Sequence, residues 1–198
     1  MVKVLYITEY FGVMPMTISK QEAADTLRDI TKTERRTVSD LGYQMAWPHL
    51  IIWGVIWLFG YSAMAAGVTW DYLWLVLSGI GSLASFAAGY ATAQRHGKGF
   101  DGRFLATFVV IFLFVSAVFI ILPPRSPIQY GAFFPILVAL YYALIGIWTR
   151  GWRMLVLGVL LGVLTLFGFL HLQAHFMALM AVVGGGGLIL GGLWLRTA

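Results

Sequence analysis

Long apolar segments dominate the chain from residue 47 almost to its last residue. Six of them are long enough to cross a hydrocarbon core of about 30 Å, which takes about 20 helical residues. They lie near residues 47–67, 71–93, 103–122, 130–148, 154–170 and 174–195. Short connections such as "VTWD" and "PPRSPIQ" join antiparallel neighbours. The pattern predicts an all-α integral membrane protein, with a domain of six transmembrane helices over residues 46–198.

A long polar run precedes the apolar segments and reads "SKQEAADTLRDITKTERR". Ser19 and Glu22 have the spacing of a capping box, in which each side chain bonds a free backbone N–H at the start of a helix. Opposite charges that stand three residues apart in this run share a face of the same helix. The run therefore predicts an amphipathic cytoplasmic, juxtamembrane helix over residues 18–45, and Gly42 offers a break before the membrane.

Residues 1–17 form a leader whose apolar positions follow neither a strand period nor a helical one. We expect this leader to be a poorly ordered tail or a short strand. Met16 offers an alternative start for the chain, and no cleavable signal peptide is apparent.

A basic cluster of Lys32, Arg35 and Arg36 lies close to the first transmembrane segment. Anionic lipid headgroups attract each such charge by about 1 kcal/mol, which favours contact with lipid. The apolar stripe within residues 19–41 favours a second interpretation, docking to a second copy or to a cytoplasmic protein. In a third interpretation the helix orients the chain, lies on the membrane and has no partner.

Composition supports the membrane class and charge predicts the orientation. Hydrophobic residues make up 60% of the 198 residues and charged residues only 11%, where roughly a quarter is usual. With the N-terminus in the cytoplasm, Arg125 is the only one of the 13 Lys and Arg residues on the opposite side. This asymmetry obeys the positive-inside rule. We expect both termini in the cytoplasm, a location in the inner (plasma) membrane, and no nucleic-acid partner despite the net charge of +5.

The chain offers few groups for metal or cofactor chemistry. It has no cysteine, which excludes disulfides and thiolate ligands. His171 and His175 stand four residues apart, a spacing that puts two imidazoles on one face of a helix. They are weak metal candidates, because no Asp, Glu or Cys lies nearby in sequence to complete a site. We expect no cofactor and no metal.

Small residues recur at helical spacing inside three of the apolar segments. Such residues let helix backbones approach closely, and serine hydroxyls can bond across the contact. The pattern favours packing of helices, within one chain or in a homo-oligomer. Its members are Ser78, Ser82, Ser85 and Gly89 in the second segment, Gly158 and Gly162 in the fifth, and Gly187 and Gly191 in the sixth.

Charged residues are absent from the middle of every segment, whereas proton relays and ion coupling usually need them there. The paired groups of acid–base catalysis are absent too. We therefore expect a non-enzymatic accessory, regulatory or scaffold subunit that acts through helix association. The alternative is a transporter of small solutes or lipids. Its uncharged pathway would be lined by Ser78, Ser82, Ser85, Tyr61 and the glycine-rich last segment, with a hinge at the run Gly184–Gly187. An integral membrane enzyme ranks third.

Overall fold

The computed structural model describes the backbone of residues 20–68, 70–95 and 102–197. It describes side chains at residues 21, 23–25, 42–68, 70–94, 102, 106–107 and 109–197. The chain divides into two compact units, Met1–Thr37 and Val38–Ala198. Within the first unit, the described residues are helical from Lys20 onward.

Every element in the described part of the chain is a helix, as the apolar pattern predicts. In chain order they are α1 (Lys20–Ala65), α2 (Leu73–Arg95), α3 (Gly102–Ile121), α4 (Pro127–Thr149), α5 (Trp152–His171), the 3₁₀-helix η1 (Gln173–His175), α6 (Phe176–Leu179), the π-helix η2 (Met180–Gly186) and α7 (Gly187–Arg196).

Five helical stretches are long and apolar enough to cross a membrane. They are Gly42–Ala65, Leu73–Gln94, Pro127–Thr149, Trp152–His171 and Gln173–Arg196. The remaining apolar stretch that can be assessed from the described residues is Val109–Ile121 of α3, which is shorter. The structure thus confirms a helical chain with several helices of membrane-crossing length, and the sixth span stays a prediction.

The expected break at Gly42 is wrong. α1 runs through Gly42 without a break, because glycine costs only about 1 kcal/mol relative to alanine and nothing else there ends the helix. The helix also continues through Pro48, since it begins at Lys20 and ends at Ala65. The leader 1–17 and Ser19 of the capping box lie outside the described residues.

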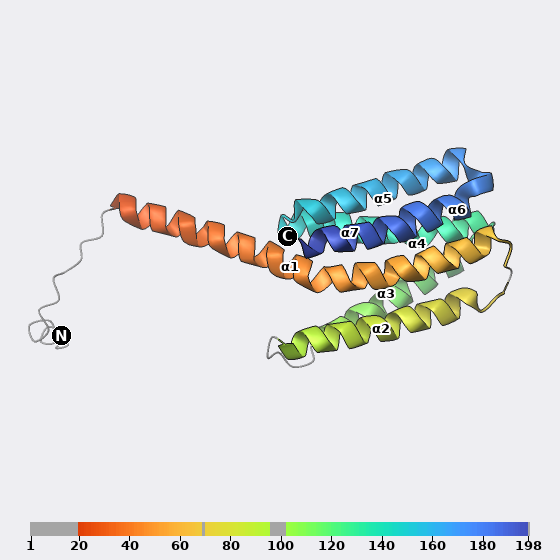
Figure 1. The fold of residues 1–198 in the computed structure, drawn as a ribbon, viewed down its shortest axis with the longest axis horizontal. Helices are drawn as coiled ribbons and strands as arrows, with labels where there is room; N and C mark the ends of the chain where they lie inside the picture. The colour runs from red at the N-terminus through yellow and green to blue at the C-terminus, as the bar shows by residue number, and fades with distance from the viewer. Residues whose placement is uncertain (1–19, 69, 96–101, 198) are drawn as a thin grey trace, which may run out of the picture. The chain divides into compact units, whose positions relative to one another are not determined.

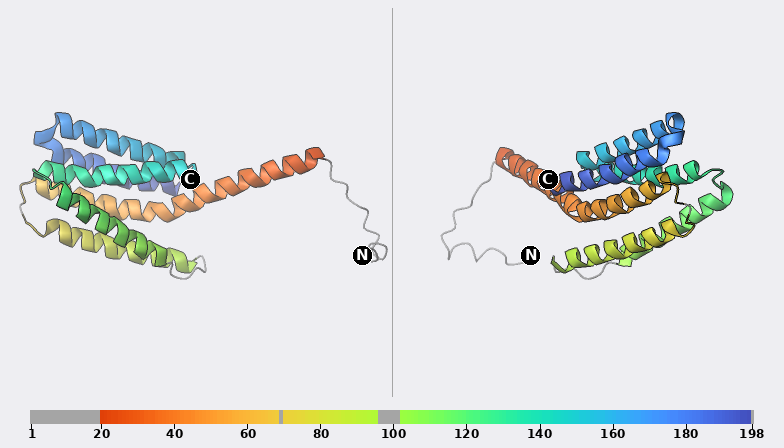
Figure 2. Two further views of the ribbon diagram at one scale, coloured as in Figure 1. Left: turned by 180° about the vertical axis from the view of Figure 1, so that it is seen from behind. Right: turned by 45° about the vertical axis from the view of Figure 1, so that its right-hand side comes forward.

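Within Val38–Ala198, α1 lies between two groups of helices. α4, α5 and α7 lie together on one side of α1, and α2 lies on the other (Figures 1 and 2). Gly54 of α1 faces Ile189 of α7, and Gly60 faces Trp74 of α2. α5 packs along α4 and also contacts α7 through Leu157.

The core of this unit sits among α1, α4, α5 and the last span. The largest fully buried side chains all come from these elements: Tyr61, Phe176, Leu50, Met180, Leu195, Thr165 and Pro135. None of the described side chains of α3 is buried. The unit therefore has an apolar core, and α2 and α3 are less covered than the other helices by the described part of the chain.

The last span keeps a helical backbone through its glycine run but changes its winding. The stretch from Met180 to Gly186 is a π-helix, which α7 continues from Gly187. π-helices are rare and each tends to be short, so this segment departs from the regular helix expected of a simple span. The glycines allow the change because they add no side chain that would have to be repacked.

Candidate functional site

Gly158 of α5 lies where α5 closely approaches α4, and Gly162 faces the same helix. A Cβ atom added to Gly158 would lie 2.5 Å from the backbone nitrogen of Ala143 and 2.6 Å from the carbonyl oxygen of Ala139. At Gly162 the added atom would lie 3.4 Å from the Cβ atom of Ala139, an ordinary contact. The two helices therefore touch backbone to backbone at Gly158, within one chain.

The glycines of the last span differ from one another in their surroundings. A Cβ atom on Gly191 would lie 2.8 Å from Leu157 of α5, whereas Gly187 has nothing within 4 Å. The closest approach to α1 occurs at Gly185, against Leu58, and at Gly192, against Ile51. Sequence reasoning missed these two glycines, although they stand two helical turns apart and so share a face.

The small residues of α2 lie in its contact with α1. Ser85 is 7% exposed, and its hydroxyl has no hydrogen-bond partner among the described groups. Ser78 and Ser82 are half-buried. Gly89 comes within 3.9 Å of His49 when a Cβ atom is added to it. Of these residues, Ser85 is buried within the described part of the chain and Gly89 faces α1.

Tyr61, which the transporter alternative assigned to a pathway, is buried among aromatic side chains. Its ring lies edge-on to Trp57 and Trp74, with centroids 6.0 and 4.9 Å away. Its hydroxyl donates a hydrogen bond to the carbonyl oxygen of Gly131 on α4, at 2.5 Å. These contacts leave Tyr61 in a packed position.

The two histidines lie in different elements. His171 ends α5, and His175 ends the 3₁₀-helix that follows. The four-residue spacing therefore does not put both imidazoles on one face of one helix. Both side chains are exposed. The ring of His171 lies beside that of Phe167, with centroids 5.2 Å apart. The described residues contain no group of three or more His, Cys, Asp or Glu suited to a metal.

The basic cluster of Lys32, Arg35 and Arg36 lies on the helical backbone of α1, and its side chains are outside the described set. Most side chains of the docking surface proposed within residues 19–41 are likewise outside the described set.

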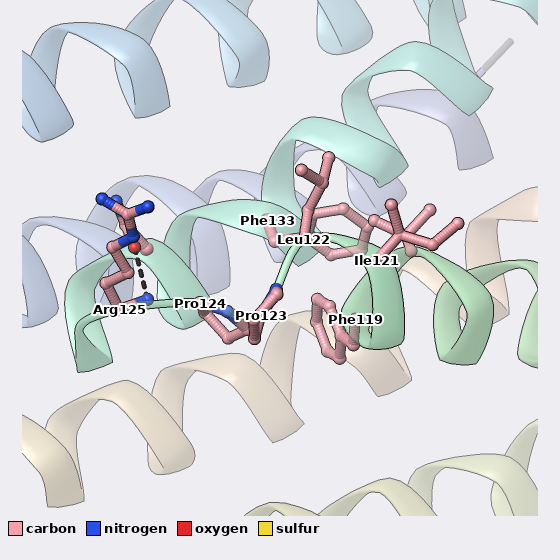
Figure 3. A pocket seen from close by; sticks show the side chains of 9 residues that line it. Phe119, Ile121, Leu122, Pro123, Pro124, Arg125 and Phe133 are labelled. Carbon is pink, nitrogen blue, oxygen red and sulfur yellow. Dashed lines mark hydrogen bonds between the residues drawn. The ribbon is translucent and has the colours of Figure 1, made fainter.

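A shallow cavity of about 440 Å³ lies where α3 turns into α4 (Figure 3). Apolar side chains such as Phe119, Leu122 and Phe133 line most of it, and Arg125 lies at its edge. The backbone N–H of Arg125 donates to the side-chain oxygen of Gln129, at 2.6 Å. Ser126 caps α4 by accepting from the backbone N–H of Gln129. The cavity is a feature of this turn and is lined by only one charged side chain.

A second polar feature lies where the apolar stretch Gly42–Ala65 of α1 begins. We define the arginine–tryptophan cluster as Trp47, Trp152, Arg153, Trp194 and Arg196. The guanidinium of Arg153 donates from Nη1 to the carbonyl oxygen of Trp194, at 2.7 Å. Its Cζ atom lies 5.3 Å from the centre of the Trp194 ring and 6.0 Å from that of Trp152.

The same cluster joins the last turn of α7 to the start of the first apolar stretch. The Cζ atom of Arg196 lies 5.2 Å from the centre of the Trp47 ring. Arg153 also lies 6.0 Å from the ring of Tyr43. Sequence reasoning counted these arginines only in the charge asymmetry and assigned no site role to the tryptophans. The motifs "GWR" and "WLR" were the available signal that the two belong together.

Comparison of the chain with models of known families, with curated proteins and with solved structures finds no match. The chemistry must therefore be inferred from the side chains themselves. The arginine–tryptophan cluster can hold an anion at the edge of an apolar bundle, and the glycine contacts can hold helices together.

Proposed function

We propose that this chain is a non-enzymatic, multi-pass protein of the inner (plasma) membrane. It acts as an accessory, regulatory or scaffold subunit through helix association. The observation that carries this proposal is the exposure of α3. All six residues from Val109 to Phe114 are at least 41% exposed.

Six consecutive residues cover more than a full turn of a helix, since each turn takes about 3.6 residues. Every face of this stretch of α3 is therefore at least 41% exposed with respect to the described part of the chain. Helices in lipid associate through close van der Waals packing and not through a hydrophobic driving force. The stretch Val109–Phe114 therefore offers exposed apolar surface to another helix.

Six spans with both termini in the cytoplasm are part of the same proposal. Trp47, near the start of the first apolar stretch, contacts Arg196 at the end of the last one. An odd number of crossings would separate these residues by the thickness of the membrane, so this contact supports an even number. α3 is 20 residues long, and an ideal helix of that length measures about 30 Å.

Cysteine cross-linking in native membranes tests the association. Because the chain has no cysteine, a single substitution reports on one position. Phe112→Cys on α3 is the probe, and Val163→Cys on α5 is the matched control, since these side chains are 65% and 59% exposed. We expect oxidation to cross-link Phe112→Cys to a second copy, or to a heavier adduct with a partner chain, and to leave Val163→Cys monomeric.

Native mass spectrometry of the full chain in gentle detergent provides the second measurement. An association through α3 predicts a complex heavier than one chain. Equal cross-linking at both positions, together with the mass of a single chain, would show that α3 faces lipid only and would refute the proposal.

A further inference from the structure

The arginines of the cluster lack a nearby carboxylate among the described side chains. In Val38–Ala198 the one described carboxylate belongs to Asp71, which follows the far end of α1. The cluster packs on the near end of the stretch Gly42–Ala65, whose 24 residues measure about 36 Å as a helix. Coulomb attraction across such a distance is screened at physiological salt, so Asp71 does not neutralise these charges.

The structure holds one of the two guanidinium groups in a fixed position. Arg153 is half-buried, and its bond to the Trp194 carbonyl uses one of five N–H donors. The ring of Trp194 lies edge-on to that of Trp152, with centroids 5.1 Å apart, and both rings lie within cation–π range of Arg153. The remaining donors are therefore oriented without a partner of opposite charge among the described side chains.

The second guanidinium is brought to the same end of the unit by the last turn of α7. Arg196 is exposed and lies over the ring of Trp47. Arg196 lies over Trp47 and Arg153 lies 6.0 Å from the ring of Tyr43, so both charges are near the start of the stretch Gly42–Ala65. Two guanidinium groups with several N–H donors each match the several acceptor oxygens of a phosphate group.

The side chains and helices around the two arginines favour a lipid headgroup over an anion dissolved in water. The tryptophan rings lie at the ends of apolar helices of membrane-crossing length, and Trp152 is 59% exposed. Tryptophan concentrates at the level of lipid headgroups, where an apolar ring meets a polar layer. We propose that the arginine–tryptophan cluster is a binding site for the phosphate group of an anionic phospholipid. Acyl chains of the bound lipid extend along the apolar faces of α5 and α7.

Native mass spectrometry with added lipid tests this site in the full chain. The probes are phosphatidylglycerol and phosphatidylcholine with identical acyl chains. We expect the unmodified protein to retain phosphatidylglycerol in preference to phosphatidylcholine. Removing the charge with Arg153→Gln or Arg196→Gln should weaken the apparent affinity about fivefold each, since one charge near the headgroups contributes about 1 kcal/mol.

Arg125→Gln is the matched control, because it removes an exposed arginine at the other end of the unit. It should leave the retention of phosphatidylglycerol unchanged. If Arg153→Gln fails to fold, Arg196→Gln still tests the site, since its side chain is exposed. Arg153→Lys keeps the charge but loses the planar fork, and we expect an intermediate affinity.

Three results would overturn the assignment. The first is equal retention of the two lipids by the unmodified protein. The second is undiminished retention of phosphatidylglycerol after both substitutions in the cluster, or a loss with Arg125→Gln as large as theirs. The third is displacement of the lipid by an equal concentration of inorganic phosphate, which would make the site one for a dissolved anion.

Discussion

A proline in the middle of α4 explains a hydrogen bond in the core. Pro135 has no backbone N–H, so the carbonyl oxygen of Gly131, four residues earlier, loses its usual helical partner. In an apolar core an unsatisfied carbonyl is costly. The hydroxyl of Tyr61 on α1 donates to this oxygen. The side chain of one helix thus satisfies a carbonyl that another helix has freed, as transmembrane helices with proline require.

Tyr61→Phe tests this pairing at the scale of single residues. The substitution keeps the ring contacts and removes the hydroxyl, so we expect a loss of about 1 to 2 kcal/mol in the free energy of unfolding. Pro135→Ala restores the N–H that Gly131 lacks. The same Tyr61→Phe change should therefore cost less in the Pro135→Ala background. A double-mutant cycle of denaturant unfolding in detergent measures this difference.

The cycle has an outcome that contradicts the explanation. If Tyr61→Phe costs as much in the Pro135→Ala background as in the unmodified chain, the hydroxyl does not compensate for the proline. The bond would then be an ordinary contact between two helices.

At the scale of helices, the α4–α5 contact depends on glycine. The atom that Gly158→Ala adds would meet the backbone of α4, which cannot rotate away as a side chain can. We expect the two helices to separate locally and the free energy of unfolding to fall by about 1 to 3 kcal/mol. Thermal unfolding in detergent measures the change.

Gly187→Ala is the control for that prediction. It makes the same chemical change in another apolar helix, at a position with nothing within 4 Å. We expect it to be neutral or stabilising, because alanine favours a helix by up to about 1 kcal/mol over glycine. Equal melting temperatures for the two variants would mean that the α4–α5 contact is not as close as the structure has it.

The apolar pattern of the sequence predicts the length of the helices but not their winding or their contacts. The pattern predicted helices of membrane-crossing length, because a run of apolar residues is sufficient to define such a helix. It did not predict the π-helix at Met180–Gly186, because an apolar run defines the length of a helix and not its winding. Glycine spacing likewise marked Gly187, which is open, and missed Gly185, which packs on Leu58.

The arginine–tryptophan cluster was not predictable for a related reason. Its members come from three segments, and their contacts depend on which helix ends meet. Trp47 and Arg196 lie far apart in the sequence and yet in contact in the structure. The sequence reveals that each residue type suits a membrane boundary, and only the fold brings the two arginines to one end of the unit.

At the scale of the whole molecule, the number of spans decides on which side each turn lies. With six spans, the turn between α1 and α2 and the turn between α3 and α4 lie on the outside, and the end of α7 lies in the cytoplasm. If α3 did not cross, the α3–α4 turn would lie inside and the end of α7 outside. The α1–α2 turn would lie outside in both cases, so it serves as a reference.

Single cysteines in these segments distinguish the two arrangements in intact cells. We expect a membrane-impermeant maleimide to label Val68→Cys and Pro124→Cys, and to label Thr197→Cys only after the membrane is permeabilised. All three residues are exposed. Labelling of Thr197→Cys in intact cells, with protection of Pro124→Cys, would mean that α3 does not cross. The positive-inside rule favours the first result, because six spans leave only Arg125 outside among 13 basic residues, whereas five would bring Arg125 inside and put Arg150, Arg153 and Arg196 outside.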